Sequence, residues 1–535
     1  MGARNMNKMI CNLRVLPALI VVFLFAASTN ATTPGVSGTA FSLSARPAFI
    51  SQPDGAMVYS WGYSCEGGGS PVPVSVSSPA ACNGTMQVPG PTLVVQAPSS
   101  GTTTVTVTLT NNLPAHAGNT SILFPGFLVS TTGGVAGLLT QEAAPGNPVT
   151  YSLTIPSTAA GTHAYYSGTQ GDLQVEMGLY GAIIVLPSTT PSACASGVHA
   201  LNVQASLAHG ETVQTLAPAA YNHPGACYDR EYLFQFSEID PRIHRQVEEQ
   251  LDAIRTCTAT SGCPTALNVA TEPYVPAYFM VNGRSMPDLM DANYTAQYLH
   301  QPYNGNPHMH PGELVLLRII GQGRWQHPFH EHGNHVRVLA RDGNLITSTT
   351  DPSVNLAGPL LFTTTTTPGQ TIDGIYYWTG KGLNWDAYGH NPDSVDPLGK
   401  LSCTPDENGY NTGDPSAVNY FEWCQDHNKP VQATPVGDVP GGGPATLPDP
   451  NIFANGAWYG GSPYLGPNAT IRAVGSTGTT PPSGTVGNSP SEEAGFAFMW
   501  HSHNEREITT NNIFPGGMMM MMLVDSREFV IDEKK

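Results

Sequence analysis

The segment His327-Pro328-Phe329-His330-Glu331-His332-Gly333-Asn334-His335 is the most informative part of this chain. Side chains two residues apart on a β-strand point to the same face, so this segment presents His330 and His332 together. His501 and His503 form a second pair with the same spacing near the C-terminus. Four imidazoles from two such pairs make a nitrogen-rich site that suits copper or zinc. The sequence therefore predicts one metal site built from two distant segments.

At these segments the chain resembles the multicopper oxidases, the family of laccases and bilirubin oxidases. The family carries a His-Pro-x-His-x-His-Gly segment, which is nearly intact from His327 to Gly333. The family's final His-Cys-His segment is altered, because Ser502 stands where the family has the cysteine that holds its type 1 copper. Glu507 stands where the second histidine of that copper is expected. The resemblance implies the family's fold together with a changed copper chemistry.

Two earlier motifs keep the family's framework and lose its histidines. Residues 120–126, Thr-Ser-Ile-Leu-Phe-Pro-Gly, are similar to the family's Thr-Ser-Ile-His-Trp-His-Gly. Residues 161–168, Gly-Thr-His-Ala-Tyr-Tyr-Ser-Gly, are similar to Gly-Thr-x-x-Tyr-His-Ser-His, and residues 178–185 keep Gly-Leu-Tyr-Gly-Ala-Ile-Ile-Val. In this alignment four residues stand in place of histidines: Leu123, Pro125, Tyr166 and Gly168.

The resemblance also indicates how many metal ions to expect. In the family, the positions of His330, His332, His501 and His503 contact a trinuclear copper cluster, which needs eight histidines. Because four of those donors are replaced, we expect one ion rather than three. Copper is favoured by the Irving–Williams order, and zinc is the alternative metal. The other interpretation is a pocket without metal, in which hydrogen bonds satisfy the four histidines.

The neighbours of these histidines have expected roles of their own. His327 would be a type 1 copper ligand in the family, but without the thiolate and the second histidine we expect it to pack beside the site. His335 could contact the ligands or the metal from the far side of the motif. Glu331 and Glu505 interleave the histidines, and on strands they should face away as solvated carboxylates.

Two further features are weaker candidates for metal binding. His308 and His310 form a third His-x-His pair at a loop or strand edge. A run of five methionines begins at Met518, and the thioethers of Met518 and Met520 could bind copper. A buried final strand, in which methionine fills gaps in the core, is the favoured interpretation of that run.

The remainder of the chain predicts an all-β protein of tandem cupredoxin-like Greek-key β-sandwich domains. Charged residues make up only 11% of the chain, which is typical of secreted β-rich proteins with many turns. We expect one domain over residues 36–188 and a cupredoxin-like C-terminal region over residues 194–535, with an irregular insertion at about 380–490. Residues 241–255 form the one predicted amphipathic helix. Three domains, the commoner number in the family, are the alternative.

The N-terminus predicts export from the cytoplasm. Residues 1–31 have the basic start and apolar core of a cleaved signal peptide, so a periplasmic or extracellular location is expected. The net charge of −18 becomes −21 when the three basic residues of this segment are removed, which disfavours nucleic acid. No later segment predicts a membrane span. The expected partners are a metal ion and, as weaker predictions, an extracellular or periplasmic protein and further copies of this chain.

The cysteines support the same location. Eight of the nine follow the predicted signal, and an even number in an exported chain predicts disulfides. The sequence does not determine their connectivity, but sequence order suggests the pairs Cys65–Cys82, Cys194–Cys227, Cys257–Cys263 and Cys403–Cys424.

Two functions therefore fit the sequence. The first is an oxidoreductase of the multicopper oxidase type that works at a reduced, mononuclear histidine-rich copper site without type 1 copper. The second is a non-catalytic metal-binding or structural protein with the same domains. The family's electron path runs through the cysteine that Ser502 replaces, so we expect metal binding without four-electron reduction of oxygen. A P-loop, a nucleotide-binding glycine pattern and a His-Glu-x-x-His motif are absent from the sequence.

Overall fold

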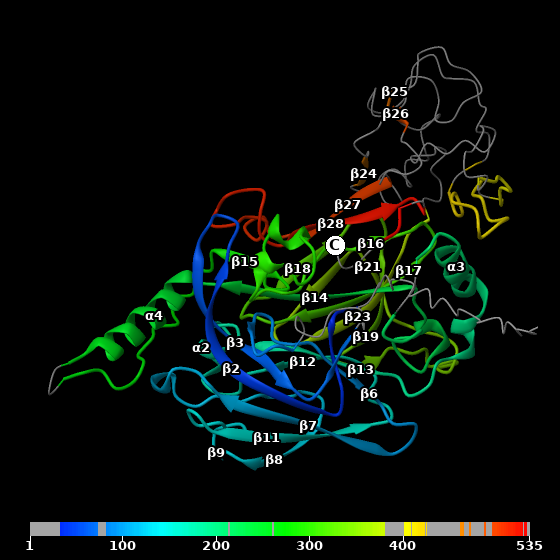
Figure 1. Ribbon diagram of the computed structural model, residues 1–535. Coiled ribbons are helices and arrows are strands. Elements are labelled where there is room, and N and C mark those ends of the chain that lie inside the picture. Colours follow the sequence, from blue (N-terminus) through cyan, green and yellow to red (C-terminus); the bar gives the residue numbers. More distant parts are fainter. Residues whose placement is uncertain are drawn as a thin grey trace, which may run out of the picture.

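The computed structural model describes residues 33–72, 82–211, 215–258, 262–379, 401–407, 409–422, 424, 461–464, 470–471, 486–487, 495–527 and 529–531. The predicted signal at 1–31 lies outside these ranges, as does most of the predicted insertion at about 380–490. Figure 1 shows four sheet layers, stacked from the N-terminal strands in blue and cyan to the C-terminal strands in orange and red. The predicted all-β fold class is confirmed.

The first two layers form an N-terminal β-sandwich. One sheet has the strand order β12-β13-β6-β1-β4, the other has the order β5-β3-β2-β7-β11-β8, and β9 pairs with β10 separately. In β7 every second residue, Val105, Val107 and Leu109, is buried, and the threonines between them are more exposed. The strands are β1 Gly35–Ser37, β2 Ala40–Ser51, β3 Met57–Gly67, β4 Ser70–Val72, β5 Met86–Gln87, β6 Leu93–Gln96, β7 Thr102–Asn111, β8 Leu128–Gly133, β9 Val135–Ala136, β10 Gln141–Glu142, β11 Pro148–Pro156, β12 Gly161–Tyr166 and β13 Tyr180–Leu186.

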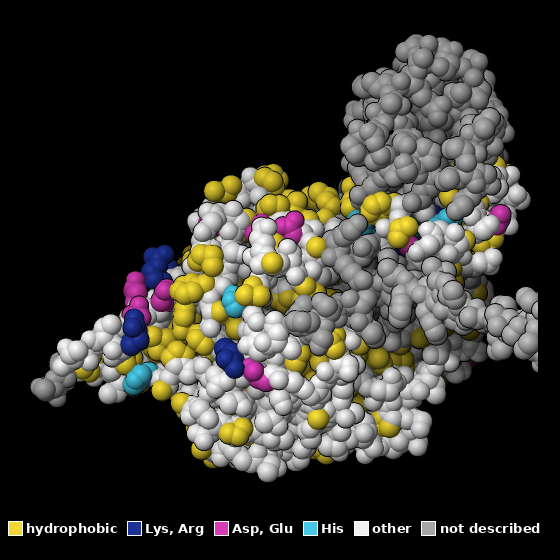
Figure 2. All heavy atoms as spheres, in the orientation of Figure 1, with side chains coloured by type: hydrophobic (Ala, Val, Ile, Leu, Met, Phe, Trp, Pro, Cys, Tyr) yellow, Lys and Arg dark blue, Asp and Glu magenta, His cyan; other side chains and the backbone are white. Residues whose placement is uncertain are grey.

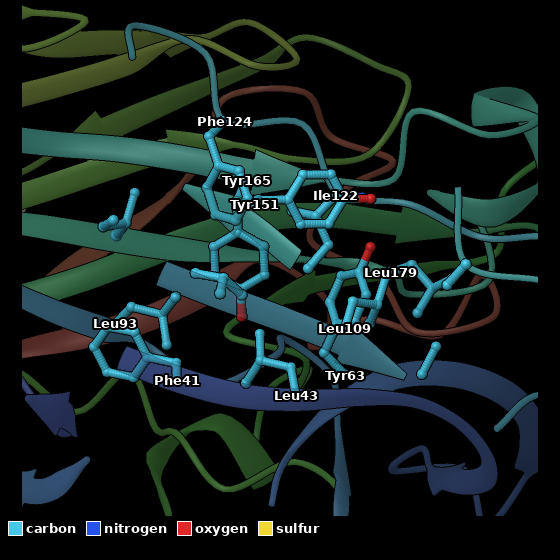
Figure 3. Close-up of a cluster of buried hydrophobic side chains, with 14 of the residues drawn as sticks. Phe41, Leu43, Tyr63, Leu93, Leu109, Ile122, Phe124, Tyr151, Tyr165 and Leu179 are labelled. Atoms are coloured by element: carbon cyan, nitrogen blue, oxygen red, sulfur yellow. The ribbon is translucent and has the colours of Figure 1, made fainter. Parts of the chain in front are cut away.

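Aromatic side chains fill the core of this N-terminal sandwich (Figure 3). The ring of Phe124 lies 5.9 Å from the rings of both Tyr151 and Tyr165, measured between centroids. Tyr63 packs against Tyr165 with a centroid distance of 5.7 Å. Buried rings of this kind contribute a large share of the apolar area of a core. The segment 120–126, which holds Phe124, is therefore anchored in the core.

The last two layers form a second, C-terminal sandwich. One sheet has the order β15-β14-β17-β23-β19-β20, with β21 on β19; the other has the order β16-β28-β27-β18-β22, with β24 on β27. The strands are β14 Arg230–Ile239, β15 Tyr278–Val281, β16 His308–Met309, β17 Leu314–Gly321, β18 His327–Glu331, β19 Val336–Arg341, β20 Asn344–Leu345, β21 Leu360–Leu361, β22 Thr363–Thr366, β23 Thr371–Tyr377, β24 Gly461–Tyr464, β27 Gly495–Ser502 and β28 Met519–Asp525. A separate pair is formed by β25 Thr470–Ile471 and β26 Val486–Gly487.

In the described part of the chain, helices are few and lie outside the sheets. The predicted helix at 241–255 is present as α4, Pro241–Thr256; the Asp240 side chain caps it by accepting the Arg242 N–H at 3.0 Å. The helix α3, Gly197–Ala208, was not predicted, because its buried positions include Asn202 and Ser206 and give no apolar periodicity. The shorter elements are α2 Gly171–Gln174, η1 Ala115–Ala117, η2 Ser192–Ala195, η3 Pro224–Ala226, η4 Asp288–Met290 and η5 Ala296–Tyr298.

All four suggested disulfides are present: Cys65–Cys82, Cys194–Cys227, Cys257–Cys263 and Cys403–Cys424. Among the described residues, every helix is too short or too polar to cross a membrane.

Candidate metal centre

Two neighbouring strands bring the predicted histidine pairs together. β18 and β27 pair antiparallel, with His330 opposite His501 and Phe329 opposite Ser502. Phe329 and Trp500 point into the core of the C-terminal sandwich. Because side chains alternate along a strand, His330 and His501 point to the other face of the sheet. The backbone continues around Gly333, where φ is +97° and an added Cβ would lie 2.2 Å from the Tyr376 hydroxyl.

The four imidazoles form one cluster. The ring centroid of His330 lies 5.0 Å from that of His332, 5.6 Å from that of His501 and 4.8 Å from that of His503. The centroid of His501 lies 5.2 Å from that of His332 and 5.6 Å from that of His503. The Nε2 atoms of His332 and His501 are 3.2 Å apart. The spacing of His332 and His501 suits one metal ion at about 2 Å from each nitrogen, and the rings of His330 and His503 would have to turn toward that ion to join it.

Hydrogen bonds outside the cluster orient these rings. Nδ1 of His501 lies 2.7 Å from the carbonyl oxygen of Ser502. A carbonyl oxygen only accepts, so Nδ1 carries the proton and Nε2 keeps its lone pair for a ligand. Nδ1 of His330 lies 2.7 Å from the Thr363 hydroxyl. Trp500 Nε1 donates to the backbone carbonyl of His332 at 3.0 Å, which fixes the backbone of that residue.

The environment favours neutral imidazoles. Burial and the neighbouring imidazoles of His332, His503 and His501 lower the pKa of His330 to about 4. Burial also lowers the pKa of His501, against the opposing effect of its hydrogen bond to the Ser502 carbonyl. Neutral imidazole is the form that binds a metal ion.

The positions that the family uses for type 1 copper are occupied by a different arrangement. Nδ1 of His327 lies 2.9 Å from Oε2 of Glu507, and Nε2 of His327 lies 2.9 Å from Oε2 of Glu238. The Ser502 hydroxyl donates to Oε2 of Glu507 at 2.5 Å. Burial lowers the pKa of His327, but the hydrogen bonds and charges of Glu238 and Glu507 outweigh it and raise the pKa to about 9. His327 is therefore an imidazolium held between two carboxylates.

Glu238 was missed by the sequence reasoning. It belongs to no histidine motif and lies on β14, where all ten residues are buried. A buried acidic residue must be paired with a partner or protonated. The signal that could have identified Glu238 is therefore an acidic residue within a strand that is otherwise buried.

One sequence expectation is wrong. Glu331 was expected to be solvated, but it is fully buried and points toward the core, beside Phe329 in the alternation of β18. Its Oε1 accepts the Thr364 hydroxyl at 2.5 Å, and burial raises its pKa well above the usual value. The alternation was predicted correctly, but the face of β18 that carries Glu331 is buried instead of solvated. Glu505 is exposed, as expected.

The structure places the weaker candidates elsewhere. His335 is half-buried, with its ring 3.7 Å from that of Phe362. β28 and β27 separate β16, which carries His308, from β18. His308 and His310 are bound to carboxylates of their own: His308 Nδ1 lies 2.6 Å from Asp525 Oδ2, and His310 Nε2 lies 2.9 Å from Glu211 Oε1. Met518 and Met520 are fully buried in the core of the C-terminal sandwich, in agreement with the favoured interpretation.

Glu211, His310 and Glu313 have ligand atoms within 4.8 Å of one another, a spacing that a metal ion could use. The Arg230 guanidinium, however, donates to Glu313 at 2.5 Å and to Glu211 at 2.7 Å. Arg527 adds a second positive charge, with its Nη1 4.0 Å from Oε1 of Glu313. The two arginines balance the two carboxylates, so we interpret this group as a buried ion-pair network.

The two N-terminal motifs meet without forming a ligand site. The Leu123 N–H donates to the Tyr166 carbonyl at 2.7 Å, so the segments 120–126 and 161–168 lie side by side. A Cβ added at Gly168 would lie 2.7 Å from Cγ of Leu123. The side chain of Leu123, at one replaced histidine position, therefore fills the space next to another, Gly168.

Comparisons with known proteins agree with the resemblance. Residues 73–190 match one family model described as multicopper oxidase, Cu-oxidase_3, and residues 270–374 match a second, Cu-oxidase_2. No curated protein matches the chain. Solved structures with a similar chain include the multicopper oxidase mgLAC, with 15% identity, a TM-score of 0.42 and coverage of 91% of this chain and 86% of that one. A blue copper oxidase from Nitrosomonas europaea has 14% identity, a TM-score of 0.42 and coverage of 91% and 85%. A copper nitrite reductase from the same organism has 15% identity, a TM-score of 0.37 and coverage of 64% and 85%.

Proposed function

We propose that this chain, whose residues 73–190 and 270–374 match multicopper oxidase family models, is a copper-binding, oxidoreductase-like protein that uses a reduced, mononuclear site. Its ligands are His330, His332, His501 and His503, and type 1 copper is absent. The observation that carries the proposal is the convergence of four imidazoles, with ring centroids 4.8–5.6 Å apart, from two segments distant in sequence.

The donor set supports one copper or zinc ion at this cluster. Imidazole nitrogen is a suitable ligand for both metals, and a site of three or four such nitrogens is chemically complete. His501 presents Nε2 to the cluster because its Nδ1 is bound to the Ser502 carbonyl. A bound copper ion would supply one-electron redox chemistry, whereas zinc would supply only Lewis acidity.

The residues at the type 1 position do not fit copper. A thiolate is missing, because Ser502 offers a hydroxyl that is already hydrogen-bonded to Glu507. Both nitrogens of His327 are bound to carboxylates, so neither has a lone pair free for a metal. A cationic imidazolium at this point would also repel a second cation. We therefore derive no electron transfer through a type 1 centre.

A non-catalytic role in metal binding or structure is the second candidate. It is favoured by the close approach of Leu123 to Gly168, which are two of the positions where the family needs histidine. Without those donors, a three-copper cluster cannot assemble. The rate of oxygen consumption by copper-loaded protein distinguishes the two roles.

The remaining assignments are proposals of the same kind. We propose two cupredoxin-like domains, residues 36–188 and 194–535, in a chain exported by the signal at 1–31. The four disulfides support an oxidising compartment.

A protein partner and self-association stay predictions. Figure 2 shows hydrophobic side chains gathered at the upper left, where Figure 1 places the β2–β3 hairpin and the loop between β27 and β28; Met57, Ile513 and Phe514 are exposed in these segments.

Metal titration tests the proposed site. Chelator-treated protein should take up about one tightly bound copper or zinc ion per chain, measured by mass spectrometry of metals and by calorimetry. The double variant His332→Ala/His503→Ala should lose this binding, and His308→Ala/His310→Ala, the matched control pair, should keep it. Three coppers per chain together with rapid oxygen consumption would show that the motif alignment is wrong.

A further inference from the structure

Three buried side chains from three segments meet beside the four-histidine cluster. Glu238 comes from β14 in one sheet of the C-terminal sandwich, and His327 comes from β18 in the facing sheet. Glu507 comes from the loop between β27 and β28. All three are at most 2% exposed, and both links between imidazole and carboxylate measure 2.9 Å. We call this group the Glu238–His327–Glu507 cross-link, because it joins the two sheets at one end of the sandwich.

Backbone and side-chain donors fix both carboxylates. Oε1 of Glu238 accepts the N–H groups of Arg324 at 2.6 Å and Trp325 at 2.8 Å. Oε1 of Glu507 accepts the amide of Asn504 at 2.9 Å. Neither carboxylate depends on His327 alone for its position, so the imidazolium is held from two anchored sides. A buried charge pair is stable only where its remaining lone pairs are satisfied in this way.

The cross-link is connected to both histidine pairs. Ser502 donates its hydroxyl to Glu507 at 2.5 Å and lies between His501 and His503. His327 begins β18, the strand that leads to His330 and His332. The His503 N–H donates to the Pro328 carbonyl at 2.8 Å, so the two strands are also joined directly at this point. A shift of Glu507 or His327 would therefore move one histidine pair relative to the other.

We propose that Glu238, His327 and Glu507 are positioning residues for the four-histidine site, and that their cross-link takes the place which the family gives to type 1 copper. A metal-free ion pair then sets the spacing of the two His-x-His pairs before any metal binds. Preorganised ligands bind more tightly, because binding does not have to order them. The inference rests on the proposed function, since it concerns the same metal site.

The test separates positioning from stability in general. Glu507→Gln removes the charge of one anchor, and Ser502→Ala removes only the hydroxyl that connects the cross-link to His501 and His503. The matched control is Glu231→Gln on the same strand as Glu238. The Glu231 carboxylate is also buried and pairs with Arg318 at 2.9 Å, seven residues away from Glu238 in the sequence.

Two readouts are measured on folded protein. The first is the dissociation constant for zinc, from competition with a chromogenic chelator; the second is the electron paramagnetic resonance spectrum of the Cu(II)-loaded protein. Glu507→Gln and Ser502→Ala should weaken zinc binding roughly 10–100-fold, the usual effect of removing a group that orients metal ligands. Both should also change the Cu(II) spectrum. Glu231→Gln should keep the wild-type spectrum and affinity even though it lowers the thermal stability.

Each outcome decides between defined alternatives. If wild-type protein binds zinc and the two cross-link variants bind it equally well, the positioning role is wrong while the proposed function stands. Equal weakening by Glu231→Gln would also overturn it, because the effect would then be one of general stability. If the wild-type protein itself binds no metal, the proposed function fails and the inference fails with it. Should Glu507→Gln not fold, Ser502→Ala, which keeps every charge, gives the decision.

Discussion

The charge on His327 makes the stability of the metal-free protein depend on pH in a defined direction. Its folded pKa is about 9, whereas an unperturbed histidine has a pKa of 6.5. The groups facing it are Glu238 from β14 and Glu507 from the loop after β27. The Tyr274 hydroxyl and the Arg324 backbone N–H both donate to Glu238. A group whose folded pKa is raised binds its proton more tightly in the folded state. Its stabilisation is therefore complete below pH 6.5 and is lost as the pH rises through about 9.

The magnitude follows from the two pKa values. At about 1.4 kcal/mol for each pKa unit, the gap corresponds to about 3 kcal/mol of the free energy of unfolding. The side chain is 1% exposed, so screening by solvent does not reduce this value much. We expect His327→Gln to lose this contribution, because glutamine has no proton to release in this range.

The assay is urea unfolding of wild-type protein and His327→Gln at intervals from pH 6 to pH 9.5, with a chelator present and the disulfides intact. The difference in free energy of unfolding should be largest at pH 6 and should shrink steadily toward pH 9.5. His116→Gln, which changes an exposed histidine, should keep the wild-type profile. Parallel profiles for wild-type protein and His327→Gln would refute the assignment of an imidazolium between two carboxylates.

Three further predictions concern the metal. The copper-loaded protein should lack the intense thiolate band at roughly 600 nm, because Ser502 replaces the thiolate; a band there would falsify the ligand assignment. Zinc at about 100 times its dissociation constant should stabilise the wild-type protein by about 2.7 kcal/mol, as measured by chemical unfolding, and should leave the stability of His332→Ala/His503→Ala unchanged. Equal stabilisation of both proteins would place the metal elsewhere. The double variant Ser502→Cys/Glu507→His supplies a thiolate and an imidazole and releases Nδ1 of His327, so copper should then produce the blue band. Ser502→Cys alone should not produce it, because Glu507 still holds that nitrogen. A band in the single variant would show that the Glu507 contact does not block copper.

The sequence predicted the strands and the histidine pairs because both depend on local periodicity. Valine and leucine alternate with threonine along β7, and the His-x-His spacing puts two rings on one face, so each pattern is visible within a few residues. The outcome for Glu331 shows the limit of this reasoning. Alternation separates the two faces of a strand, but it does not show that both are buried, as His330 and Glu331 are here. Glu238 was missed for a related reason, since the partners of its carboxylate lie between 36 and 89 residues away in the sequence.

The distribution of retained and replaced ligands explains why one ion is expected. All four retained histidines lie on or directly after β18 and β27, which are neighbouring strands of one sheet. All four replaced positions lie in the segments 120–126 and 161–168 of the N-terminal sandwich, where Leu123 and Tyr166 now pair through their backbones. A metal held by the retained set needs no ligand from the N-terminal sandwich. Four imidazoles can complete one coordination sphere and cannot complete three, so with the N-terminal donors replaced we expect a single ion at this site.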